Sequence, residues 1–348
     1  MGRLEARAGI RMLLLMVVAL ISAGLCAEGF ESKDTKSVVE RPNPSGPPTE
    51  VKIGIYLLDL THIDDVNQLF SVDLFVDVTW QDPRLAVPEK MRIGKIQRRP
   101  LEEIWTPRLL ILNDRGLSAH LPRVAEVDDL GNVNTQQRVS GELSTNLLFE
   151  DFPFDTQVLP IRIVSYSYSA QDLHFSIDNQ INWDDGSLSA EGWRFRIIGP
   201  EFDEFYLPAK KTVWAQLTYL IEAKRNSQYY MLTMFLPVSM IVLMSWFVFW
   251  LPPDVIPSRV GISTASIFSL IAFSLSIRLG LPRVSYLTHA DTFLIGCTLL
   301  VILALGMVVI GTRWVQTDRL KDALRLNAVA RWVYAGLFFL TAMITLMV

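Results

Sequence analysis

Apolar residues are concentrated after position 228, where four long runs predict helices that cross a membrane. The runs cover residues 229–251, 260–277, 292–312 and 332–348. A helix needs roughly 20 residues to span a bilayer, and flanking residues can lengthen the shorter runs. We therefore expect helices at about 229–251, 258–279, 290–312 and 328–348, with a short linker at 313–327 between the last two.

The pattern before position 228 is different, because short alternating or apolar runs are separated by turn residues. These runs lie at 51–60, 71–80, 138–149, 157–166, 192–200 and 213–224. No long amphipathic helical pattern lies between them, and this spacing is typical of an antiparallel sandwich. Residues 51–228 are thus expected to form one immunoglobulin-like β-sandwich, followed by an all-α domain of four helices at 229–348.

The N-terminus has the pattern of an export signal. Three arginines at positions 3, 7 and 11 precede an apolar stretch at 12–25, and small residues follow. Residues 1–27 are therefore predicted to be a signal peptide, with acylation of Cys26 as the alternative. The polar, proline-rich residues 28–50 are predicted to be a flexible leader. If Cys26 is removed, Cys297 is the remaining cysteine, so the exported domain has no disulfide.

The second apolar run carries an unusual number of hydroxyl groups. Residues 260–277 include no charged residue, but they include five serines and one threonine. Such a helix suits a water-lined cavity or helix packing better than contact with lipid. Spacings of three and four place one set of residues on a common face, namely Gly261, Ala265, Phe268, Ala272, Leu275 and Leu279.

Charge and composition exclude several classes of protein. The net charge is −4 and no basic stripe with interleaved aromatic residues occurs, so nucleic acid is not an expected partner. No catalytic set, cofactor motif or metal-ligand spacing stands out, and paired broken helices typical of transporters are missing from the pattern. Basic residues gather in or beside the linker between the last two helices, which predicts that this linker is cytoplasmic and the sandwich external.

Several ordered motifs carry a resemblance to a known family. They are WQDPRL at 80–85, IWTP at 104–107, FPFD at 152–155, SWFVFW at 245–250, PSRVG at 257–261 and LPRVSY at 281–286. With them, residues 51–348 resemble a subunit of the pentameric ligand-gated ion channels, the Cys-loop receptor superfamily, in its prokaryotic form. The family's disulfide would join the positions of Thr145 and Leu159, so this chain lacks it.

The resemblance implies an assembly, a location and partners. Four identical subunits would complete a homopentamer in a bacterial inner membrane, with the sandwich outside the cytoplasm and the second helix of each subunit lining the pore. The implied partners are membrane lipid, permeant ions and a small extracellular ligand or protons. No cofactor is implied. Ionic current would separate such a channel from a non-conducting membrane sensor, which is the alternative from another class.

The resemblance also implies a ligand pocket between subunits, lined by aromatic residues. Tyr166 occupies one such position, and a capping loop would supply Phe202, Phe205 and Tyr206. Trp105 is a further candidate, with the sandwich core as its other expected place. Acidic residues near the capping loop favour a cationic amine as ligand, because aromatic faces attract ammonium groups. His289 is a candidate for a response to pH.

A coupling path between the two domains is the next expectation. The loop formed by Phe152, Pro153, Phe154 and Asp155 would press on Leu281 and Pro282, beyond the second helix. Arg225 resembles a family arginine at the domain junction, where Asp155 or an acid of the 59–65 loop would be its partner. A plain interfacial arginine is the alternative.

Ion selectivity is expected to follow from charges near the pore. No Asp or Glu occurs from Val255 to Ala290, whereas Pro257, Arg259 and Arg278 match an anion-selective, chloride-conducting channel. Asp254 argues for the cation-selective alternative. Five copies of Phe268 would form an apolar gate, unless Phe268 packs between helices and the serine edge faces water.

Overall fold

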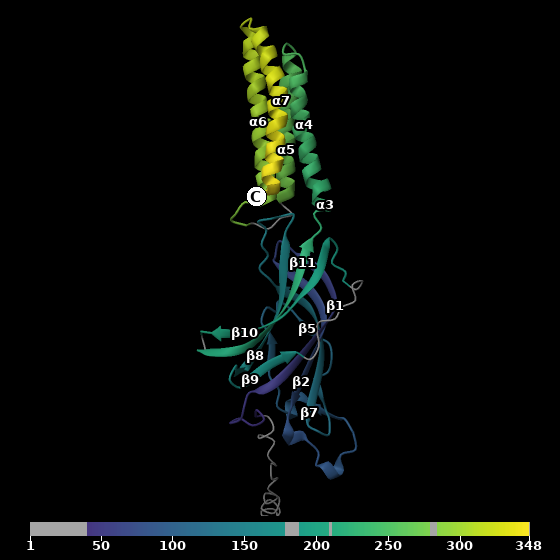
Figure 1. Ribbon diagram of the computed structural model, residues 1–348. Coiled ribbons are helices and arrows are strands. Elements are labelled where there is room, and N and C mark those ends of the chain that lie inside the picture. Colours follow the sequence, from purple (N-terminus) through teal and green to yellow (C-terminus); the bar gives the residue numbers. More distant parts are fainter. Residues whose placement is uncertain (1–39, 178–187, 209–210, 279–283, 348) are drawn as a thin grey trace, which may run out of the picture.

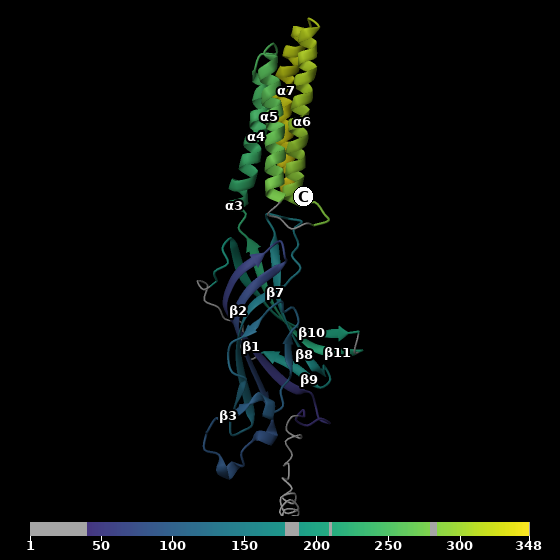
Figure 2. The same cartoon turned by 180° about the vertical axis from the view of Figure 1, so that it is seen from behind.

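Two structural parts lie end to end in the computed structural model, a β-sandwich and a bundle of long helices (Figure 1). The structure describes residues 40–177, 188–208, 211–278 and 284–347. The predicted signal peptide and most of the predicted leader lie outside these residues. The C-terminus lies at the end of the bundle that faces the sandwich (Figures 1 and 2).

The sandwich consists of two sheets, and the chain crosses between them. In the larger sheet the order is β3-β6-β7-β2-β1-β9, with β5 paired to β7; the strands are β1 (Thr49–Asp64), β2 (Leu69–Gln81), β3 (Gln97–Pro100), β5 (Ser118–Ala119), β6 (Val124–Val127), β7 (Asn132–Ser144) and β9 (Leu173–Ile177). The smaller sheet has the order β10-β11-β8-β4, formed by β4 (Leu109–Ile111), β8 (Thr156–Ser169), β10 (Trp193–Leu207) and β11 (Thr212–Arg225).

Each of the six runs predicted from the sequence overlaps a strand, so the sandwich prediction is confirmed. One pairing departs from the antiparallel expectation, because β1 and β9 are parallel, with Thr49 opposite Leu173. The short strands β3 to β6 and β9 were not predicted, since their few residues carry too little alternation to stand out.

The core of the sandwich lies between the two sheets and follows from alternation along the strands. In β1 the alternate residues Val51, Ile53 and Ile55 are fully buried. They share a continuous core with Leu217, Tyr219 and other alternate residues of β11 in the opposite sheet. The Tyr219 hydroxyl donates to the carbonyl oxygen of Ile53 at 3.0 Å and so ties the two sheets together. The described residues of the sandwich contain no disulfide. Burial of this continuous apolar core stabilises the domain in its place.

The sandwich begins earlier than predicted, because the end of the expected leader is fixed to it. Arg41 is buried, and its guanidinium donates to the carbonyl oxygens of Pro44, Pro47 and Asp172. This side chain holds the proline-rich segment against the start of β9. The boundary at residue 51 is therefore corrected, since Arg41 supplies backbone contacts that composition alone did not predict.

Four helical spans follow the sandwich, each long and apolar enough to cross a membrane. The first span, Gln228–Trp250, is made of α3 (Gln228–Tyr230), η4 (Met231–Phe235), α4 (Leu236–Phe247) and η5 (Val248–Trp250). The wide π-type turn η4 ends just before Pro237, whose ring nitrogen has no hydrogen to donate. The remaining spans are α5 (Ile256–Arg278), α6 (His289–Gln316) and α7 (Leu320–Met347).

The predicted linker at 313–327 is much shorter in the structure. Helix α6 continues to Gln316, and α7 begins at Leu320. The start of α7 is amphipathic: Ala323, Asn327 and Ala330 are buried at helical spacing, while the charged residues lie outside. The charges of this first part lower the local hydropathy. The predicted start of the helix, at about residue 328, therefore lies beyond its actual start at Leu320.

Candidate functional site

Arg225, the last residue of β11, forms the centre of the junction between the two domains. Its guanidinium donates to both carboxylate oxygens of Asp155, at 2.8 and 3.2 Å, and to both of Asp65, at 2.7 and 2.9 Å. The Tyr230 hydroxyl at the start of the first membrane span accepts a further bond at 3.2 Å. Both partners expected from the sequence, Asp155 and an acid of the 59–65 loop, are thus present together.

Aromatic rings complete the surroundings of this arginine. Its guanidinium carbon lies 4.1 Å from the ring centroid of Trp193, 5.1 Å from that of Phe152 and 5.6 Å from that of Tyr230. Burial disfavours the charged guanidinium, but the hydrogen bonds and charges of Asp65 and Asp155 outweigh this, so the pKa of Arg225 lies above its ordinary value. The cation is therefore held permanently between the sandwich and the membrane helices.

The loop that contains Phe152 to Asp155 contacts three separate parts of the helical domain. The N–H of Phe149 donates to the Tyr286 hydroxyl at 3.0 Å. The first N–H groups of α6, from His289 and Ala290, donate to the carbonyl oxygens of Glu150 and Phe152. The loop thereby satisfies helix-terminal N–H groups that have no partner within α6 itself.

Aromatic contacts join the same loop to the first membrane span. The Phe152 ring lies 4.9 Å from that of Tyr230, and the Phe154 ring lies 6.3 Å from that of Phe235. Phe235 in turn packs on Phe293 of α6 at 4.8 Å. A displacement of the loop would therefore alter aromatic packing on both the first and the third span. Leu281 and Pro282, the other predicted coupling residues, lie outside the described residues.

Hydrogen bonds close this loop where the family has a disulfide. The Thr145 hydroxyl donates to the carbonyl oxygen of Val158 at 3.2 Å. Closer to the tip of the loop, the side-chain amide of Gln157 accepts from the N–H of Leu148 and donates to the carbonyl oxygen of the same residue. The two ends of the loop are thus held together without a covalent bond.

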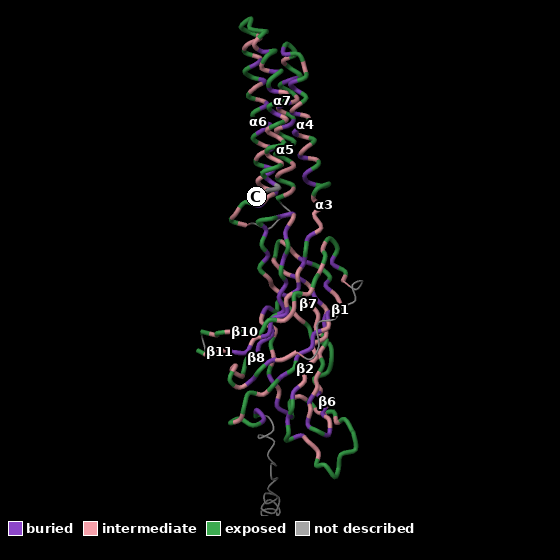
Figure 3. Tube along the Cα trace, in the orientation of Figure 1, coloured by how far each residue is buried: buried purple, intermediate pink, exposed green. Residues whose placement is uncertain are grey.

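Helix α5 carries the predicted pore residues on an open face. Pro257, Gly261, Ala265, Ala272 and Leu275 are exposed, and Phe268 is 68% exposed. Burial along the helix therefore follows the face predicted from the sequence. Figure 3 shows exposed residues, drawn in green, along the helices of the bundle. Leu279 lies outside the described residues. Phe268 does not pack between helices of its own subunit, so that part of the alternative reading is wrong.

The charged residues near α5 lie differently from one another. Arg259 is fully buried on the opposite side of the helix, where its Nη2 donates to Asn327 of α7 at 2.7 Å. Helices α5, α6 and α7 thus enclose its side chain, which does not lie on the exposed face of α5. Asp254 is exposed just before the start of α5. Arg278, at the other end of the helix, is also exposed, and its Nη2 lies 3.8 Å from Oδ1 of Asp291.

Most of the predicted ligand residues lie on or near the β10–β11 hairpin. This hairpin projects sideways from the sandwich (Figures 1 and 2). Phe202, Tyr206 and Tyr166 are exposed, whereas Phe205 is half-buried and its ring centroid lies 6.1 Å from that of Trp214. Three exposed acids, Glu201, Asp203 and Glu204, share the outer part of β10.

Trp105 belongs to the sandwich core. It is 0% exposed, its indole N–H donates to the Tyr168 hydroxyl at 2.7 Å, and its ring lies edge-on to Trp80. Direct ligand contact by Trp105 is therefore corrected to the core alternative, because packing on two aromatic neighbours leaves no surface for a ligand.

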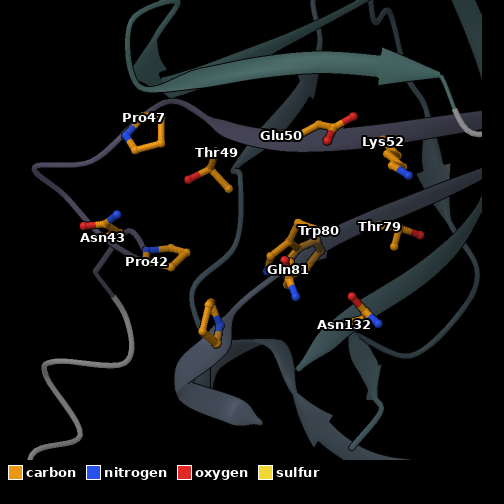
Figure 4. Close-up of a pocket in the computed structure, with 11 residues that line it drawn as sticks. Pro42, Asn43, Pro47, Thr49, Glu50, Lys52, Thr79, Trp80, Gln81 and Asn132 are labelled. Atoms are coloured by element: carbon orange, nitrogen blue, oxygen red, sulfur yellow. The ribbon is translucent and has the colours of Figure 1, made fainter. Parts of the chain in front are cut away.

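The hollows formed by described residues of the sandwich include one near its N-terminal segment and one at the domain junction. One, of about 340 Å³, lies between the N-terminal segment and the ends of β1 and β2 (Figure 4). Glu50, Lys52 and Gln81 line it, and its lining includes none of the predicted ligand residues. The other, of about 600 Å³, borders Arg225, Trp193 and Tyr230 at the junction.

The described residues contain no group of three His, Cys, Asp or Glu side chains that could hold a metal. The adjacent acids Asp128 and Asp129 accept hydrogen bonds from backbone N–H groups in turns. Asp128 accepts from the N–H groups of Leu130 and Asn132, and Asp129 accepts from those of Ile93 and Gly94. Burial opposes ionisation of Asp128, but bonds from Asn132 and neighbouring N–H groups hold its pKa below the ordinary value.

Sequence reasoning missed several residues of the junction and the bundle. Trp193, which packs on Arg225, and Asn327, which binds Arg259, were not predicted as site residues, and the bond from Arg225 to Tyr230 was not expected. Tyr286 was quoted within a motif, but its bond to Phe149 was not expected. A polar residue at helical spacing among buried alanines was the available signal for Asn327.

A β-sandwich joined to four helices that are long and apolar enough to cross a membrane, one of them with an exposed face, is the architecture expected of a receptor domain joined to a membrane domain. Comparison with protein families agrees with this class. Residues 34–230 match the neurotransmitter-gated ion-channel ligand binding domain, and residues 234–332 match the neurotransmitter-gated ion-channel transmembrane region. The chain therefore belongs to the neurotransmitter-gated ion-channel family and is a ligand-gated channel subunit, not an enzyme. It is a multi-pass membrane protein with the ligand-binding domain outside the cytoplasm.

Proposed function

We propose that five copies of this chain form a chloride-permeable pore lined by α5. The observation that carries the proposal is the face of α5 that contains Gly261, Ala265 and Phe268, which is exposed in the single subunit. An exposed face in the middle of a membrane domain must meet lipid, a neighbouring subunit or water. The small residues and neighbouring hydroxyls of this face suit water.

Anion preference is supported by the lack of acidic residues along this helix and by the positive end of its dipole. No acid occurs from Val255 to Ala290, and the α5 N-terminus, with its positive dipole end, lies at the inner end of the pore. One observation favours the second candidate, a cation channel: Asp254 is exposed just before the helix.

The gate that we propose is a ring of five Phe268 side chains, with Ala272 and Leu275 on its outer side. A narrow apolar ring can empty of water and so stop ions. Opening would follow when the sandwich binds its ligand more tightly in the open state, because binding can shift an equilibrium only by such a difference. The junction around Arg225 and the loop at Phe152 would transmit this shift.

The ligand that we propose is a small cationic amine, with protons as the alternative stimulus. Phe202 and Tyr206 present aromatic faces on the projecting hairpin, and Glu201 lies beside them. Tyr166 would contribute from β8, and the adjacent subunit would close the pocket. For the proton alternative, His289 lies 3.7 Å from Asp151 at the start of α6, where a gained charge would act on the coupling loop.

The test is the reversal potential of Phe268→Ala channels across a potassium chloride gradient. Removing the ring of phenyl groups should give current without ligand, and the reversal should lie near the chloride potential. Phe273→Ala is the matched control, because Phe273 lies on the same helix and packs against the bundle; it should stay silent, like the unsubstituted protein. A reversal near the potassium potential would reject anion selectivity and implicate Asp254.

A further inference from the structure

Arg259 at the inner end of α5 is buried in an unusual way. None of its surface is exposed, and its Nη2 donates to the side-chain oxygen of Asn327 at 2.7 Å. Its Nε and Nη1 atoms have no hydrogen-bond partner among the residues that the structure describes. Asn327 is itself buried in α7, and its Nδ2 is 3.5 Å from the carbonyl oxygen of Leu251.

The positive charge of Arg259 is therefore not neutralised within the subunit. In the described part of the chain Arg259 takes part in no ion pair, and the acceptor of its one hydrogen bond is a neutral amide. Helix α6 closes another side, because a Cβ placed on Gly311 would lie 3.8 Å from Nη1. With no exposed surface, the guanidinium has no solvent contact either. An arginine does not deprotonate in such a place, so the charge persists.

The position of this charge relative to the open face of α5 gives it a possible effect on ions. Pro257 and Gly261, two residues to either side, are exposed on that face. A helix with its side chains is about 10 Å wide, so the guanidinium lies within about one helix diameter of the face. Water and salt screen an exposed charge such as Asp254, but they screen a buried charge much less.

We propose that Asn327 determines the charge preference of the pore. Its neutral amide holds the Arg259 guanidinium in place without neutralising it, so that each subunit contributes one uncompensated positive charge beside the inner end of the pore. Five such charges favour anions over cations. This inference rests on the proposed function in one respect, that α5 lines the pore.

Asn327→Asp is the sharpest test, because it keeps the size of the side chain and its acceptor oxygen while adding a carboxylate against the guanidinium. We expect the chloride-to-potassium permeability ratio to fall by about threefold or more in the Phe268→Ala background. Reversal potentials in a potassium chloride gradient measure this ratio. Arg259→Gln, which removes the charge instead of pairing it, should shift the ratio in the same direction and serves if the aspartate variant does not fold.

A matched control separates a local effect from a general effect of negative charge. Gln316→Glu adds a carboxylate at an exposed position at the same end of the bundle, at the end of α6. Its permeability ratio should equal that of the Phe268→Ala parent. An equal shift in Gln316→Glu and Asn327→Asp would overturn the inference, and so would an unchanged ratio in both Asn327→Asp and Arg259→Gln.

The two proposals fail in different ways. The reversal potential of the Phe268→Ala parent tests anion preference by itself. The inference concerns the direction in which Asn327→Asp moves that potential, which is toward the potassium potential whichever ion the parent prefers. A chloride-selective parent with no shift in the variants would retain the proposed function and reject the role of Asn327.

Discussion

Two buried arginines, Arg225 at the end of β11 and Arg259 in the first turns of α5, differ in what surrounds them. Arg225 is bound by two carboxylates and a tyrosine hydroxyl between two domains. Arg259 is bound by one neutral amide among three helices. A paired buried cation holds elements together, whereas an unpaired one projects its field onto its surroundings. The same residue type thus joins two domains at the outer end of the membrane domain, and we propose that it serves selectivity at the inner end.

The difference has its origin in the elements that meet at each place. The junction is formed by loops and strand ends, where acids such as Asp65 and Asp155 occur next to aromatic residues. At the inner end of the bundle the charged residues of α7 lie on its outer side, and a carboxylate buried between α5, α6 and α7 would be costly. Changes at the junction should therefore affect stability and gating, and changes at the inner end should affect which ions pass.

The largest effect is expected for Arg225→Met, which leaves the Asp155 and Asp65 carboxylates without their partner. Breaking a buried pair from one side costs about 3–5 kcal/mol. The thermal midpoint of the assembled protein, measured by size-exclusion chromatography after heating, should fall steeply or assembly should fail.

Two further variants control this experiment. Arg225→Met combined with Asp155→Asn should recover part of the loss, because one unpaired carboxylate is removed. Arg196→Met removes an arginine from the exposed pair with Glu222 on the same hairpin and should change the midpoint little. If Arg225→Met alone kept the midpoint of the unsubstituted protein, the network would not hold the junction together.

A smaller effect is expected for Tyr286→Phe, which removes the acceptor of the Phe149 N–H and keeps the ring. One such hydrogen bond contributes about 1 kcal/mol. The midpoint should fall modestly, and in the Phe268→Ala background the reversal potential should not move. Tyr229→Phe, at an exposed hydroxyl, should leave both unchanged. A shifted reversal potential in Tyr286→Phe would contradict the separation between junction and inner end.

The smallest effect is expected for Asp73→Asn at a surface pair. Arg138 donates to both oxygens of Asp73, and this hydrogen bonding, opposed in part by burial, holds the pKa of Asp73 below its ordinary value. A lowered carboxyl pKa adds stability above the ordinary range near pH 4, and this stability is lost as the pH falls below it. Solvent screens the pair, so its contribution is slight at any pH.

Thermal midpoints of Asp73→Asn and the unsubstituted protein, measured from neutral pH to about pH 3, check this prediction. The difference between them should shrink on acidification, because the unsubstituted carboxylate then becomes protonated. A difference that grew in acid would be inconsistent with the pair as the source.

Much of the architecture could be predicted because it repeats along the chain. Long apolar runs predicted the four spans, because a membrane-spanning helix is apolar along its whole length. Alternation of apolar and polar residues predicted the six long strands, because successive side chains of a strand point to opposite faces. The FPFD and PSRVG motifs indicated a loop that contacts the helical domain and a helix with an exposed face. The exposed face of α5 followed from spacing alone, because residues three and four apart share a side of a helix.

The sequence by itself determined the four membrane spans, the six long strands, the residues that share a face of α5 and where basic residues lie. The tertiary structure alone decided the surroundings of each charge and aromatic ring. It put Trp105 in the core and Arg259 on the side of α5 away from its exposed face, and it brought Asp65, Asp155 and Tyr230 together around Arg225. Local period specifies burial within an element, whereas the partner of a side chain depends on contacts between residues far apart in the chain, which no local pattern records.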